Sequence, residues 1–114
     1  MLTYALIVFA VAALGGLVLA SSVLRGKLAP WALSILHALL GANGLVLLLL
    51  GVMGGSGAGR AVAALGLLVV AALGGFYLAS IHARKAVAPK AVVFIHAGVA
   101  VTGFLVLLSA VLAL

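Results

Sequence analysis

The chain has 114 residues, of which 69% are hydrophobic and 5% are charged, and its mean hydropathy is +1.62. A water-soluble domain of this size could not bury so much apolar surface in its own core. The chain contains no cysteine, which excludes disulfides, thiolate metal sites and thiol catalysis. It has six Lys and Arg residues and no Asp or Glu. Because five of the six lie in two short segments between apolar stretches, their expected partner is an anionic lipid surface rather than nucleic acid.

Four long apolar stretches separate the basic residues and predict transmembrane helices. A bilayer core about 30 Å thick is crossed by about 20 apolar helical residues. Lipid offers no partner to free backbone groups, and no stretch alternates with period two, so each stretch should be a helix rather than a strand. We predict an all-α, four-helix transmembrane bundle with an up-down-up-down course, in one membrane domain over residues 1–114. Its helices are expected at about 2–24, 31–54, 60–83 and 90–113.

The loops of this predicted bundle differ in charge. Two loops on the same side of the membrane carry the basic residues Arg25, Lys27, Arg84, Lys85 and Lys90. The connection at 51–59 on the other side carries only Arg60 at its edge. The positive-inside rule therefore predicts that loops 25–30 and 84–90 are cytoplasmic and that both termini are non-cytoplasmic, as in a bacterial inner-membrane protein.

The two halves of the chain are copies of one helical hairpin. Residues 1–55 align with residues 60–114 at a constant offset of 59 without a gap, and 21 of the 55 aligned positions are identical. A sequence rich in leucine and alanine would seldom also match by chance at arginine, proline and histidine. The matches include Arg25 with Arg84, Pro30 with Pro89, and His37 with His96. Each copy crosses the membrane twice, so both enter in the same orientation, and the second and fourth helices should lie diagonally opposite each other.

His37 and His96 occupy the same position in the two copies. An ionisable side chain at membrane depth is expensive and should face the bundle interior. Symmetry places the two rings at equal depth on diagonal helices, pointing toward each other. Two opposed neutral imidazoles can serve as the axial ligands of a haem iron, so we predict one haem b bound by both histidines.

Other matched residues would complete such a site. Glycines at the histidine level and seven residues beyond each histidine would leave room for a porphyrin: Gly15, Gly16, Gly74, Gly75, Gly44 and Gly103. The basic side chains Arg25, Lys27, Arg84, Lys85 and Lys90 could contact the haem propionates. The second ring nitrogen of each histidine should donate a hydrogen bond either to Ser21 or Ser80 or to a backbone carbonyl.

Paired histidines on one diagonal of a four-helix bundle, with glycines on the other, resemble membrane b-type cytochromes. The resemblance is architectural and covers the whole chain. It is to the haem-binding cores of the cytochrome b and cytochrome b561 groups, and equally to minimal membrane cytochromes made by design. It implies electron transfer, with quinone or a protein as redox partner, rather than enzymatic activity. Those families carry two histidines on each ligating helix and hold two haems, whereas here only His37 and His96 match, so one haem per chain is expected.

The same residues allow other interpretations. The histidines could form interhelical hydrogen bonds in a cofactor-free bundle that serves as a structural or assembly subunit of a membrane complex. A small transporter is a weaker alternative, because proton or cation coupling usually needs a membrane carboxylate. His82 aligns with Val23 and has no counterpart; it is expected to reach the headgroups, with propionate contact as a second and an alternative haem ligand as a third interpretation. Asn43 and Thr102 are matched and are expected to form interhelical hydrogen bonds, and the oligomeric state is left open.

Overall fold

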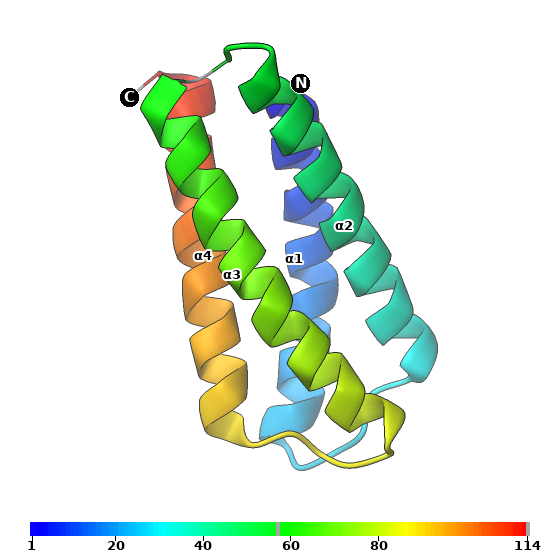
Figure 1. Cartoon of the computed structure of the whole chain (residues 1–114). Coiled ribbons are helices and arrows are strands. Elements are labelled where there is room, and N and C mark those ends of the chain that lie inside the picture. The colour runs from blue at the N-terminus through cyan, green and yellow to red at the C-terminus, as the bar shows by residue number, and fades with distance from the viewer. Residues whose placement is uncertain (57, 114) are drawn as a thin grey trace.

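The computed structural model describes residues 1–56 and 58–113, which form four antiparallel α-helices (Figure 1). The helices are α1 (Leu2–Leu24), α2 (Trp31–Met53), α3 (Ala58–Ala83) and α4 (Lys90–Leu112). The predicted all-α four-helix bundle is confirmed, and each predicted helix end lies within two residues of the observed one. Gly57 and Leu114, which the predicted domain includes, lie outside the described residues.

All four helices are long and apolar enough to cross a membrane. They contain 23 to 26 residues, which at 1.5 Å per residue is about 35 to 39 Å, against a hydrocarbon core of about 30 Å. The bundle measures 42 × 22 × 19 Å. Large apolar side chains are exposed on the outer surface of every helix, such as Leu14, Leu39, Leu73 and Ile95. This is the surface of an integral membrane protein whose sides contact lipid.

Each helix packs against two neighbours. The hairpins α1–α2 and α3–α4 form the most extensive contacts, and α2 also packs on α3 while α1 packs on α4. Helices α2 and α4 therefore lie on one diagonal of the bundle, and α1 and α3 on the other. Both chain ends and the α2–α3 connection lie at one end of the bundle, and the two basic loops lie at the other (Figure 1).

A cluster of buried apolar side chains, the apolar core, lies in the half of the bundle nearest the chain ends. Two of its contacts are matched between the repeats: the Phe9 ring packs over Gly44, and the Leu68 side chain packs over Gly103. A Cβ atom at Gly44 would lie 2.7 Å from Phe9, and one at Gly103 would lie 2.8 Å from Leu68. These close contacts bring α1 against α2 and α3 against α4. The members of this core are Leu2, Ala5, Phe9, Leu48, Ala61, Ala64, Leu68 and Leu107.

Helices α1 and α3 end in the same hydrogen-bonding motif built on different residues. The Gly26 N–H donates to the Val23 carbonyl, and the equivalent Lys85 N–H donates to the His82 carbonyl, both at 2.9 Å. The motif needs a left-handed residue just past the helix. The φ angle is +70° at Gly26 and +57° at Lys85. Because a Cβ atom makes this conformation costly, the second repeat ends its helix less favourably than the first.

We expect Lys85→Gly to stabilise the protein by about 1 kcal/mol, because it removes the left-handed strain and costs only the extra freedom of glycine in the unfolded chain. Reversible unfolding in detergent micelles would measure the change. As the matched control, Gly26→Ala should destabilise the protein by a similar amount. A loss of stability in Lys85→Gly would show that contacts of the lysine side chain outweigh the backbone strain.

Candidate functional site

The two matched histidines face each other in the half of the bundle next to the basic loops. His37 lies on α2 and His96 lies on α4, and both side chains are half-buried. Their ring centroids are 6.3 Å apart, and the ring planes make an angle of 83°. The two histidines that are equivalent in the repeats thus come together from diagonally opposite helices.

Each histidine is bonded to the backbone of the other helix in its own hairpin. Nδ1 of His37 lies 2.8 Å from the carbonyl oxygen of Ala12, and Nδ1 of His96 lies 2.8 Å from that of Ala71. A carbonyl oxygen can only accept, so Nδ1 carries the hydrogen in both rings. In the neutral imidazole, Nε2 then keeps a lone pair. A hydrogen bond of this kind is what usually orients a metal-binding histidine.

Gly16 and Gly75 make these hydrogen bonds sterically feasible. A Cβ atom at Gly16 would lie 2.9 Å from Cε1 of His37, and one at Gly75 would lie 3.1 Å from Cε1 of His96. Helical side chains lean toward the N-terminus, over the preceding turn. A side chain at position 16 would therefore also crowd the Ala12 carbonyl four residues earlier. Each glycine both admits the imidazole and uncovers the carbonyl that holds it.

The other predicted glycines have less direct roles. Cβ atoms at Gly15 and Gly74 would meet the histidine side chains at 3.9 and 3.6 Å, which are ordinary contacts. The space beside Gly44 and Gly103 is filled by core side chains, so in this structure these two glycines serve helix packing. The room expected for a porphyrin at the glycine level is taken, at the second glycine of each pair, by the imidazole rings.

The serines suggested as partners of the histidines lie outside the site. Ser21 and Ser80 are both exposed. The Ser80 hydroxyl donates to the carbonyl of Tyr77 at 2.6 Å, within its own helix. The sequence left either a serine or a backbone carbonyl as the hydrogen-bond partner of the second ring nitrogen. In the structure the partner is the backbone carbonyl.

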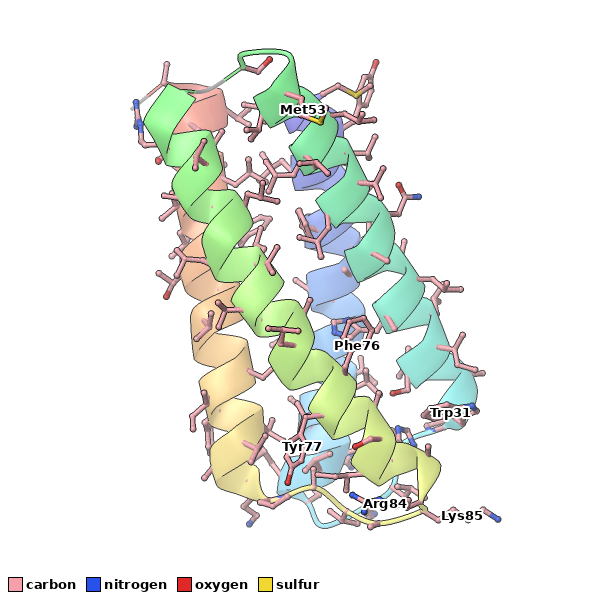
Figure 2. All side chains as sticks on the ribbon, in the orientation of Figure 1. Trp31, Met53, Phe76, Tyr77, Arg84 and Lys85 are labelled. Atoms are coloured by element: carbon pink, nitrogen blue, oxygen red, sulfur yellow. The ribbon has the colours of Figure 1, made fainter. Side chains whose placement is uncertain are left out.

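The basic side chains gather at the end of the bundle nearer the histidines. Figure 2 shows Arg84 and Lys85 at this end, together with Trp31 and Tyr77. The Nε of Arg84 donates to the Ser80 carbonyl at 3.3 Å, and Arg25 makes the equivalent bond at 3.1 Å. Both guanidinium groups thus sit at helix C-terminal ends, where positive charge is favourable. Lys27, Lys85 and Lys90 are exposed.

His82 forms a separate contact between the two hairpins. Its Nε2 donates to the carbonyl of Ala29 at 2.7 Å, and its ring meets Trp31 edge-on with centroids 5.1 Å apart. Ala29 precedes α2, so His82 ties the end of α3 to the start of α2. A shallow cavity of about 360 Å³ is lined there by Leu28, Ala29, Trp31, His82, Ala83 and Lys85. The sequence does not predict this contact of His82, because it depends on the path of the loop.

Two imidazoles are the ligands that this site offers. Across residues 1–56 and 58–113, no three His, Cys, Asp or Glu side chains come together as a metal site, so a structural zinc site with four protein ligands is not formed there. Comparisons with protein-family models, curated proteins and solved structures found no match.

We expect Gly16→Ala to destabilise the protein relative to Gly41→Ala. Alanine gains about 1 kcal/mol over glycine inside a helix. At Gly41 a Cβ atom would have no neighbour within 4 Å, so the gain is kept. At Gly16 the His37 ring must move, and the loss of its hydrogen bond costs about 1 kcal/mol or more. Unfolding in detergent micelles would compare the two variants, and equal stabilisation by both would show that the ring is not held against Gly16.

Proposed function

We propose that this protein is a membrane cytochrome b that binds one haem b through His37 and His96 and transfers electrons. The observation that carries the proposal is that both imidazole rings make the same hydrogen bond. Each donates its Nδ1–H to a carbonyl of the neighbouring helix, at 2.8 Å in both repeats. Each therefore has Nε2 available as a metal ligand, with its orientation already fixed.

The spacing of the rings also supports this proposal. With metal–imidazole bonds of about 2.0 to 2.1 Å, the centres of two rings on opposite sides of one metal lie about 6 Å apart. The observed separation is 6.3 Å. The separation of the two rings is therefore compatible with both of them holding one haem.

The charges at this end of the bundle favour a haem bound near the basic loops. The apolar core occupies the opposite half of the bundle, so one haem per chain is the expected content. No acidic residue competes for the positive charges at this end. The side chains that would contact the propionates are Arg25, Lys27, Arg84, Lys85 and Lys90.

A bound haem would supply one-electron redox chemistry. His37 and His96 would both be occupied in holding the haem, so the site would carry electrons rather than bind oxygen. The carbonyls of Ala12 and Ala71 make the imidazoles more basic ligands. The apolar helices exclude water, and a quinone or a protein would serve as the redox partner. This is the chemistry of an electron carrier rather than of an enzyme.

The protein should contain one low-spin haem b per chain when it is purified from haem-sufficient cells. Its reduced absorption spectrum should have the sharp bands of bis-histidine ligation. We expect His37→Ala and His96→Ala each to abolish this spectrum, because removing either residue removes an axial ligand. His82→Ala is the matched control and should retain it, since that ring is bonded to Ala29.

Circular dichroism would establish that the alanine variants keep their helices. A colourless wild-type protein, or a spectrum that survives both substitutions, would refute the cytochrome. That result would favour the cofactor-free bundle, in which the same carbonyl bonds only fasten the two helices of each hairpin.

The proposal includes an orientation in a bacterial inner membrane, with the basic loops in the cytoplasm. Because the chain has no cysteine, single cysteines can report it. A membrane-impermeant maleimide added to intact spheroplasts should label Ser56→Cys in the α2–α3 connection, and should label Ala86→Cys in a basic loop only after lysis. The reverse pattern of labelling would contradict this orientation.

A further inference from the structure

Asn43 presents an amide to lipid near the middle of the bilayer. It is exposed on α2, 12 residues after Trp31 and 10 before Met53, which places it about 18 and 15 Å from the two helix ends. The hydrogen bonds among the described residues include none to its side chain. The sequence predicts an interhelical bond for Asn43, but within one chain the structure turns this residue outward. The reason is that the adjacent Gly44 faces inward under Phe9.

Thr102, the equivalent residue in the second repeat, satisfies its polar group within its own helix. Thr102 is also exposed on α4, but its hydroxyl donates to the carbonyl of Gly98 at 2.7 Å. A hydroxyl can be satisfied in this way inside its own helix. The Asn43 amide has two N–H donors and an oxygen acceptor, and lipid can satisfy none of them. Asn43 therefore needs a polar partner outside its own bundle.

The outer face of α2 around Asn43 has the spacing of a helix-pair interface. The residues along it alternate at intervals of three and four, as the a and d positions of a coiled coil do, with Asn43 at a central a position. All the apolar members are 46% to 74% exposed. The same face of α4 carries Gly98 and Ser109 at two of these positions. The residues of this stripe, which ends at the Met53 labelled in Figure 2, are Leu36, Leu39, Asn43, Val46, Leu50 and Met53.

We propose that this stripe on α2 is a homodimer interface in which the Asn43 amides of two copies of the chain hydrogen-bond to each other. An amide is donor and acceptor at once, so two of them are complementary. Two copies inserted in the same orientation and related by a twofold axis along the membrane normal place both amides at the same depth. A single asparagine at an a position fixes the register of a parallel pair. His37 faces the bundle interior, so the dimer does not depend on haem.

Förster transfer between labelled full-length chains in liposomes, over a range of protein-to-lipid ratios, tests this interface. The wild type should form dimers. Asn43→Leu should weaken association about tenfold, as expected for loss of an interhelical amide bond. Asn43→Gln should restore it, because the amide is kept. Thr102→Val, the matched control, should associate like the wild type, since that hydroxyl is satisfied within α4.

Disulfide crosslinking locates the contact. Leu50→Cys should crosslink two chains on mild oxidation, and Val101→Cys, which is 55% exposed on α4, should not. His37→Ala should leave the association unchanged, so this test and the haem test fail independently. A wild type that stays monomeric at every ratio overturns the proposal, because the amide would then belong to an interface with another protein. Unchanged association in Asn43→Leu, or crosslinking through α4 instead of α2, overturns it as well.

Discussion

Each histidine of this bundle is held by a helix carbonyl that a glycine leaves uncovered. In an α-helix a carbonyl oxygen already accepts the N–H four residues later and has a second lone pair to spare. Ordinarily the side chain at that later position leans over the spare lone pair. In α1 and α3 the later positions are Gly16 and Gly75, so the imidazoles reach Ala12 and Ala71. Tautomer, ring orientation and the availability of Nε2 all follow from this one uncovered carbonyl in each hairpin.

The two halves of the bundle are stabilised by different interactions. Toward the chain ends, packing decides the structure: Phe9 and Leu68 fill the space beside two glycines and bring the helices of each hairpin close together. Toward the basic loops, the two imidazoles find their hydrogen-bond partners in two helix carbonyls rather than in a charged residue. An apolar core beyond the histidines would hold the helices at a fixed spacing whether or not a ligand joins the rings.

The sequence predicts the fold and the histidine pair because both rest on symmetry and on the thickness of the membrane. An offset that matches His37 with His96 places them at one depth, and the up-down-up-down course places them on one diagonal. The sequence does not predict which group accepts the Nδ1 hydrogen of each histidine. That depends on a rotation of α1 against α2 by a fraction of a turn. Gly16 could have indicated the acceptor, because a glycine four residues after Ala12 leaves the Ala12 carbonyl uncovered. The role of His82 depends on a loop conformation, which the apolar pattern does not encode.

Differences between the two repeats are as informative as their matches. Where the copies agree, at the histidines and their glycines, the structure builds one site on the axis between them. Some differences lie in the core, where Leu68 takes the place of Phe9, and others lie on the surface or at the loops. Lys85 replaces Gly26 at a loop, and His82 replaces Val23 beside Trp31. Asn43 stands in the first copy where the second has a threonine that satisfies itself. A duplicated hairpin whose histidines and their glycines stay symmetric while its lipid-facing sides diverge can hold one ligand between the repeats and still present one particular face to a neighbour in the membrane.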